Sequence, residues 1–430
     1  MTSNNHQARH LPVRPNLEQL KHQAKDLLRE VRRGNSSSIE EFKAHHPEPP
    51  APENAKLADA QLALARSYQV SSWPRLVKAC LLIDAIWCDD LEAVRNLVVK
   101  HPNLLHEMAR GSEKCNWGPP MSYAANLGRD EIIKMLIGLG ATDFDTAIER
   151  ATLQSKIGTA RLLHELMGSP RPPADSLDGP AYTLSASGTA LMFELGMELV
   201  DVNGKKIAPV DVVLETDSRK PSAKHQILEM YVQHGLELPD TPTMALHRGR
   251  IDLLEKHLRR DATLLHRTFT HEEIYPPDLG CHDEVLATQG TPLAGTTLLH
   301  MCVDFDELEI AQWLLERGMD VDARARVDAN GFGGHTALFA TVVSQPNYWL
   351  NRTGETQAAP FAQLLLDHGA NPNARASLRK QLHPGYDPRY DVTLHEYCDI
   401  TPLSWGRQFH AKDFVSEAAI KLIAERGGRE

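Results

Sequence analysis

The feature that most constrains the fold of this chain is a block of residues that recurs along it. The clearest copy, Gly295 to Arg324, reads GTTLLHMCVDFDELEIAQWLLERGMDVDAR. Its apolar spacing predicts a short helix that opens at Thr297, a turn at 304–307 and a second helix that ends at Gly318. Units of this kind bury their apolar faces only against their neighbours, so the repeats decide the architecture before any single motif does.

Three further copies have the same shape. Two of the units open at Pro119 and at Thr297. Their closing glycines, Gly140 and Gly318, each lie 21 residues after the opening position. One of the other two copies opens with GHTALFATVV (334–343) and closes with FAQLLLDHGANPNAR (361–375). The second opens with ITPLSWGRQ (400–408) and closes with AAIKLIAERGG (418–428).

These residues resemble ankyrin repeats, whose signature is T-P-L-H-x-A followed by a helix pair and a G-A-D-x-N-A turn. Weaker copies fill the remaining gaps, at 83–106, 144–168, 181–204, 208–238 and 243–266. The resemblance implies an all-α fold: an ankyrin-repeat solenoid of about nine helix-pair repeats over residues 81–430. It also implies a protein-binding scaffold or adaptor without chemistry of its own.

Single positions of the signature carry structural expectations. The closing glycine belongs where the second helix ends, because glycine enters the left-handed conformation without steric cost. The resemblance implies that His300 bonds the backbone at the repeat junction, and that Cys302 is a packed thiol. The sequence departs from the signature at Asp306, which replaces the usual glycine between the helices, and at Phe339 and Ser404, which replace the histidine.

Residues 1–80 differ from the repeats and form a predicted N-terminal helical segment. A helix is expected from Asn16 to Gly34, another at 57–68, and a third capped by a serine of SSWPRL. The Pro-rich stretch 45–54 separates the first two. The segment resembles a leader that precedes ankyrin repeats in bacterial proteins, and it can cap the open end of the stack.

Composition excludes several functions. The formal charge is −11, from 46 basic and 57 acidic side chains, and no basic run is interleaved with aromatic residues, so nucleic acid is an unexpected partner. No window is long and apolar enough to span a membrane. The six cysteines include no CxxC pair and the amino terminus has no apolar signal core, so a reduced cytoplasmic setting is expected.

The stretch HEEIYPPDLGCHDE, residues 271–284, has the composition of a metal or acid–base site. A zinc site here would use His271, Cys281, His282 and Asp283, yet their spacing fits no known ligand pattern. No metal or cofactor is therefore predicted. The stretch lies in an insertion ahead of the best repeat, and a polar loop that faces a partner remains the main interpretation.

Two other insertions carry aromatic residues. They are SQPNYWLNRTGETQ at 344–357 and LHPGYDPRYDVTLHEYCD at 382–399, and both are expected to extend the finger side of the repeats. Tyrosine, tryptophan and arginine dominate recognition surfaces. The predicted partner-binding residues are Tyr275, Tyr348, Trp349, Tyr386, Arg389 and Tyr390.

An alternative function stays open alongside the scaffold. The long insertions at 267–296 and 374–399 could close a pocket, which would make the chain an enzyme or a small-ligand binder. The polar residues that would line that pocket are His271, Glu272, His282, Asp283, Tyr386, Asp387, His395 and Glu396. Convergence of these loops would favour chemistry, and splayed loops would favour a partner groove.

Overall fold

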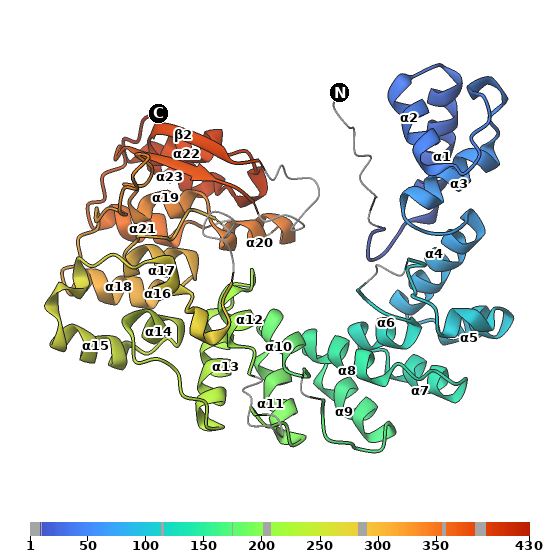
Figure 1. Cartoon of the computed structure of the whole chain (residues 1–430), viewed down its shortest axis with the longest axis horizontal. Helices are drawn as coiled ribbons and strands as arrows, with labels where there is room; N and C mark the ends of the chain where they lie inside the picture. Colours follow the sequence, from blue (N-terminus) through green and yellow to red (C-terminus); the bar gives the residue numbers. More distant parts are fainter. Residues whose placement is uncertain are drawn as a thin grey trace. The chain divides into compact units, whose positions relative to one another are not determined.

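A computed structural model of the chain, drawn in Figure 1, gives the structure. It describes residues 9, 11–112, 116–173, 175–200, 208–282, 290–354, 358–382 and 393–430. This part of the chain divides into two compact units, 1–172 and 173–430. Both units are built almost wholly from helices, so the predicted all-α class is confirmed.

The first unit holds nine α-helices within its described residues. They are α1 (Leu17–Arg32), α2 (Ser36–His45), α3 (Leu57–Ser67), α4 (Trp73–Trp87), α5 (Leu91–Lys100), α6 (Pro120–Leu127), α7 (Asp130–Gly138), α8 (Phe144–Leu153) and α9 (Ile157–Leu166). Short 3₁₀ turns stand at η1 (Pro52–Asn54) and η2 (Pro102–Leu105).

The second unit continues the pattern and adds one small sheet. Its α-helices are α10 (Asp178–Tyr182), α11 (Ala186–Glu194), α12 (Val210–Glu215), α13 (Pro221–Gln233), α14 (Pro242–His247), α15 (Ile251–Arg260), α16 (His271–Ile274), α17 (Leu298–Asp304), α18 (Leu308–Glu316), α19 (Ala337–Val342), α20 (Gln345–Thr353), α21 (Pro360–Asp367), α22 (Pro402–Gln408) and α23 (Glu417–Glu425). The strands are β1 (Ala376–Lys380) and β2 (His395–Ile400), and the 3₁₀ turns are η3 (Ala262–Leu265), η4 (Pro277–Leu279) and η5 (Lys412–Phe414).

Within each unit, successive helices pack as pairs, and neighbouring pairs stack. Over the described residues there are nine such pairs: α4/α5, α6/α7, α8/α9, α10/α11, α12/α13, α14/α15, α17/α18, α19/α21 and α22/α23. Stacking between pairs is seen for α4 on α6 and for α17 on α19, among others. The predicted number of repeats, about nine, agrees with this arrangement.

The expected N-terminal helices are present. Asn16 caps α1 by accepting from the Gln19 N–H, and Ser72 caps α4 by accepting from the Arg75 N–H. Helix α2 is an addition to the expected set, because its serine-rich start SSSIEEF lacks a clear apolar stripe. Helix α4 runs through residue 80, the domain boundary expected from the sequence, and that boundary stays a prediction.

The local conformations of the repeats follow from the signature residues. Gly140 and Gly318 end their helices at φ 102° and 88°, as expected. Asp306, which stands where the repeat usually has glycine, also adopts a left-handed φ of 62°. Few residues other than glycine take this conformation cheaply, so the turn between α17 and α18 holds an acidic side chain at a local cost.

His300 performs the predicted structural role. Its Nδ1 lies 2.9 Å from the Thr297 hydroxyl, and its Nε2 donates to the carbonyl oxygen of His335, 3.1 Å away on the next finger. Burial lowers the pKa of His300 to about 3, so the ring is neutral and accepts from Thr297. Cys302 is fully buried, which agrees with a packed thiol.

The fingers between repeats are joined by backbone hydrogen bonds. The Arg326 N–H donates to the Gly295 carbonyl at 2.7 Å, and the Gly333 N–H donates to the Ser377 carbonyl at 2.7 Å. Beyond Ser377, β1 pairs antiparallel with β2. The fingers of the last repeats therefore form one connected layer.

Helix α20 corrects the expectation for 344–357. This insertion is a helix rather than a finger loop, and it lies between α19 and α21, the two helices of one repeat. Its first residues, SQPN, are a good helix start, with a proline in the first turn. The Trp349 indole N–H donates to the Asp217 carbonyl oxygen at 2.8 Å, which anchors α20 to the segment that follows α12.

The close packing of α22 predicts a large effect at Gly406. A Cβ at this position would lie 2.2 Å from Val342 Cγ1 and 2.9 Å from Ile420 Cδ1. We expect Gly406→Ala to lower the free energy of unfolding by about 1–3 kcal/mol in urea denaturation, because the stiff valine cannot move aside. Gly138→Ala is the matched control: nothing lies within 4 Å of its Cβ, so it should be neutral or slightly stabilising.

Candidate functional site

The first predicted site segment, of which residues 271–282 are described, folds back onto the repeats. The His282 N–H donates to Glu215 Oε1 at 2.7 Å, and its ring Nδ1 lies 3.4 Å from Glu215 Oε2. His271 and Tyr275 are both buried, with ring centroids 5.1 Å apart. The expectation that Tyr275 is exposed to a partner is therefore wrong. A capping box, formed by Thr270 and Glu273, turns this end of the segment inward.

Cys281 is also buried, and Glu272 is exposed. Within the described ranges, no three histidine, cysteine, aspartate or glutamate side chains are grouped closely enough to hold a metal ion. Asp283, the fourth residue of the zinc alternative, lies outside the described residues.

The second predicted segment contributes strand β2. His395 stacks on His410 with ring centroids 4.0 Å apart, and the Tyr397 hydroxyl lies 2.8 Å from His410 Nδ1. Glu396 is exposed and faces Arg379 across the sheet. The other predicted residues of this insertion, Tyr386, Asp387, Arg389 and Tyr390, lie outside the described residues, so convergence of the two loops stays a hypothesis.

The aromatic residues of 344–357 have separate roles. Tyr348 is 3% exposed and stacks on Phe414 at 4.8 Å, so its predicted exposure is wrong. Trp349 remains 37% exposed, but its indole N–H is used to anchor α20. The burial of Tyr348 and the anchoring bond of Trp349 both arise because α20 is a helix, and one face of it packs on the repeats.

Sequence reasoning missed a cluster of buried charges in the second unit. The Arg219 guanidinium donates to both Asp304 Oδ2 and the Asp304 carbonyl oxygen, at 3.0 and 2.8 Å. Both side chains are almost fully buried, at 6% and 1% exposure. The guanidinium also lies over the Phe305 ring, 5.1 Å from its centroid. Because burial removes the water around each charge, such a pair is stable only when its hydrogen-bond geometry is good.

A second buried pair lies beside the first. Lys224 Nζ and His225 Nε2 approach the same oxygen, Glu307 Oε1, at 3.2 and 2.8 Å. Burial lowers the pKa of Lys224, opposed by the Glu307 carboxylate, and burial raises the pKa of Asp304, opposed by Arg219. Asp304 ends α17 and Glu307 caps α18, so the two carboxylates flank the turn that departs from the repeat signature.

Lys380 is the unusual member of this cluster. It ends β1, where Ala376, Leu378 and Lys380 share the buried face. Its Nζ is fully buried and has no hydrogen-bond partner among the described residues. Burial lowers the pKa of Lys380 to about 7, although the Asp304 carboxylate acts to raise it. The strand alternation of ASLRK was the one sequence signal that could have placed this lysine inside.

Two surface features complete the candidates. A groove of roughly 300 Å³ runs between the last fingers, lined by Arg324, Val327, Gly331, Gly333, Arg375 and Asp399. We call this groove, together with the adjacent Arg326, the finger face. Val327 is 54% exposed. Arg324 and Arg326 form no ion pair within the described part of the chain, whereas Arg375 pairs with Asp399 at 2.8 Å.

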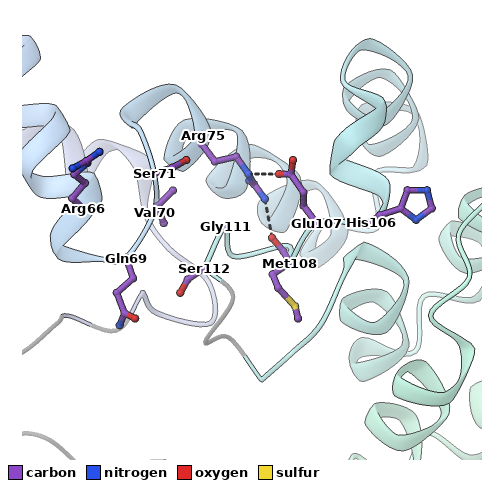
Figure 2. Close-up of a pocket in the computed structure, with 10 residues that line it drawn as sticks. All are labelled: Arg66, Gln69, Val70, Ser71, Arg75, His106, Glu107, Met108, Gly111 and Ser112. Atoms are coloured by element: carbon purple, nitrogen blue, oxygen red, sulfur yellow. Dashed lines mark hydrogen bonds and ion pairs between the residues drawn. The ribbon is translucent and has the colours of Figure 1, made fainter.

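The first unit also has a pocket of roughly 880 Å³, between α3, α4 and the loop after η2. Figure 2 shows ten of the residues that line it. Arg75 reaches across it: Nε donates to Glu107 Oε2 at 2.7 Å and Nη2 donates to the Met108 carbonyl oxygen at 2.8 Å. The remaining wall includes Arg66, Gln69 and Ser112. Because Arg75 is already paired, Arg66 is the further arginine or lysine among the described residues that line the pocket.

No helix in the described residues is long and apolar enough to cross a bilayer. Comparisons with known proteins address the repeats. The family model for the ankyrin repeat matches residues 294–326, which include α17, α18 and the start of the next finger. No curated protein matches the chain.

Among solved structures, the chain is similar to the human ASB11 ankyrin repeat domain. The two are 15% identical with a TM-score of 0.27, over 72% of this chain and 99% of that one. The matched repeat 294–326 contains the Thr297–His300 bond, the helix pair and the closing Gly318 described above. Together with the family match, these features show that the chain contains an ankyrin repeat at residues 294–326.

Proposed function

We propose that this chain is a scaffold or adaptor that binds a partner protein through the finger face. Ankyrin repeats are generally modules of protein interaction, which supports the class of function. The observation that carries the choice of surface is Val327, an aliphatic side chain left 54% exposed beside the groove.

The arginine side chains of the finger face favour a negatively charged partner. The chain carries a formal charge of −11, yet Arg324 and Arg326 stand on this face with no ion pair in the described residues. Arg324 instead donates to the carbonyl oxygens of Gly334 and Arg375, both at 2.8 Å, which fixes the guanidinium in place. A preorganised arginine next to an exposed aliphatic side chain suits a partner segment that is both acidic and apolar.

The expected setting is the cytoplasm. Within the described residues, Cys80, Cys88, Cys302 and Cys398 form no disulfide, which supports a reducing compartment. Neither nucleic acid nor a membrane is proposed as a partner, in keeping with the acidic net charge. A bacterial origin remains a prediction from the N-terminal segment.

Selection from a random library of displayed peptides tests the proposal. We expect the selected peptides to be rich in Asp, Glu and apolar residues, and their affinity to fall by about tenfold or more in Val327→Asp and in Arg326→Glu, since each loses roughly 1.4 kcal/mol or more. Lys421→Glu, on the exposed face of α23, is the matched control and should retain binding. Equal loss in the control, or no enriched peptide, would rule out the finger face as the binding surface.

A further inference from the structure

We propose that Lys380 and Asp304 form a reactive site in which the Lys380 amine condenses with a small uncharged carbonyl compound, an aldehyde or a ketone, to give an imine. The site lies in the second unit, among α17, α20 and β1. It is separate from the finger face and does not depend on the proposed protein binding.

Two polar atoms of this site lack hydrogen-bond partners among the described residues. They are Lys380 Nζ and Asp304 Oδ1, and both are buried. Leaving such an atom unpaired costs on the order of 1–3 kcal/mol, and more when it is charged. Asp304 is held from one side only, since Arg219 takes its Oδ2 and its carbonyl oxygen.

The two atoms influence each other without touching. The Asp304 charge acts on Lys380, yet their side chains form no ion pair within 4.0 Å. Lys224 provides the contrast, because its Nζ lies 3.2 Å from Glu307. A lysine with only a structural role would be expected to contact its carboxylate in the same way. The separation leaves a donor and an acceptor that a third group can bridge.

Gly290 keeps the carboxylate side of this space narrow. A Cβ at Gly290 would lie 2.9 Å from Asp304 Oδ1 and 3.2 Å from the backbone nitrogen of Gln345, the first residue of α20. The inserted helix α20 and the segment before α17 therefore close around Asp304. Asp304 Oδ1 is therefore tightly enclosed, so the carbonyl compound must be small and can enter only when the site opens.

The charges around the site favour an uncharged ligand. Arg219 and Lys224 are matched by Asp304 and Glu307 in two buried pairs. With Lys380 as the free amine, no buried cation of these pairs is left over to attract a carboxylate or a phosphate. An aldehyde or ketone adds no net charge to the cluster, so its entry costs less than that of an anion.

The chemistry uses the groups that are present. The nitrogen lone pair of Lys380 attacks the carbonyl carbon, and one amine proton passes to the oxygen to give a carbinolamine. The Asp304 carboxylate then takes the remaining N–H proton and passes it to the hydroxyl group, which leaves as water while the C=N bond forms. Burial supports both roles, since it lowers the pKa of Lys380 to about 7 and raises the pKa of Asp304. Every atom of the amine and the carbonyl compound is accounted for in the imine and one water.

Access to the amine requires local opening. Lys380 is the last residue of β1, a strand of five residues that pairs with the six residues of β2. A two-stranded sheet is only marginally stable by itself, so its end opens more readily than the helix pairs.

Acetaldehyde with sodium cyanoborohydride, applied to the full chain at pH 7, tests the proposal by trapping the imine as an ethylamine. At this pH only roughly 1 in 2,500 exposed lysines is unprotonated. Peptide mapping at limiting reagent should therefore find Lys380 modified about tenfold or more faster than Lys421, whose side chain is 79% exposed. If Lys380 reacts no faster than Lys421, the proposal is overturned.

Two variants separate reactivity from structure. Lys380→Arg keeps a long polar side chain but removes the amine, so it should abolish the fast-reacting site and leave the modification of Lys421 unchanged. Asp304→Asn should slow the modification of Lys380 about fivefold or more while circular dichroism confirms that the helices remain. An unchanged rate at Lys380 in a folded Asp304→Asn variant would contradict the role given to Asp304.

Discussion

Arg219→Ala is expected to destabilise the second unit by about 3–5 kcal/mol, a larger loss than the one expected for Gly406→Ala. Removing the guanidinium leaves the Asp304 carboxylate buried with neither oxygen paired, and it leaves the Thr216 carbonyl oxygen without the donor that now lies at 2.6 Å. The stacking of Arg219 on Phe305 is lost as well. The cost is therefore that of an uncompensated buried charge.

Urea unfolding measures the total loss, and hydrogen exchange of α13 and α17 shows where it arises. The control is Arg426→Ala, which breaks the Arg426–Asp367 pair at a similar distance of 2.8 Å but on the surface, where the side chains are 41% and 51% exposed. Surface pairs contribute about 0–1 kcal/mol, so this variant should unfold nearly as the wild type does. A similar loss in the free energy of unfolding of both variants would mean that burial does not make the Arg219–Asp304 pair more important for stability than a surface pair.

The repeat fold could be predicted from sequence because its signals are local. Gly318 marks the end of a helix by a backbone conformation that other residues avoid, and Thr297 with His300 fixes the first turn through side chains three positions apart. Such signals need no knowledge of distant contacts. The same reasoning found the caps at Asn16 and Ser72.

The buried cluster could not be predicted, because its partners are far apart in the chain. Arg219 and Asp304 are separated by 85 residues, and sequence gives no sign that they meet. In isolation Asp306 and Glu307 look like an ordinary solvated turn. Only stacking of the repeats brings this turn against α13 and converts surface charges into buried ones.

The expected loop at 344–357 was wrong for a related reason. Composition at 344–357 suggests an exposed loop with Tyr348 and Trp349 at its surface. The chain instead uses a serine and a proline to start α20, and Tyr348 then packs on Phe414. Aromatic residues in an insertion indicate binding only when the insertion has no neighbour to pack on, and sequence does not reveal that neighbour.

Lys380→Met is expected to raise the stability of the chain at pH 7, because it replaces an unpaired buried amine with an apolar side chain of similar length. Replacing buried charges in this way is often neutral or stabilising by about 1–4 kcal/mol. Loss of the reactive amine together with a gain in stability would be the mark of a residue kept for function.

The pH dependence gives the sharper measurement. Burial sets the pKa of Lys380 at about 7 in the folded chain, below the value near 10.4 of an unfolded lysine. Between these two values the unfolded state binds more protons, so wild-type stability should rise with pH, by about 2–3 kcal/mol from pH 7 to pH 9. Lys380→Met lacks this contribution, and its advantage over the wild type should shrink by the same amount. Urea unfolding of both proteins at several pH values isolates the difference from all other titrations, and a difference that does not change with pH would show that Lys380 is protonated and solvated in the folded chain.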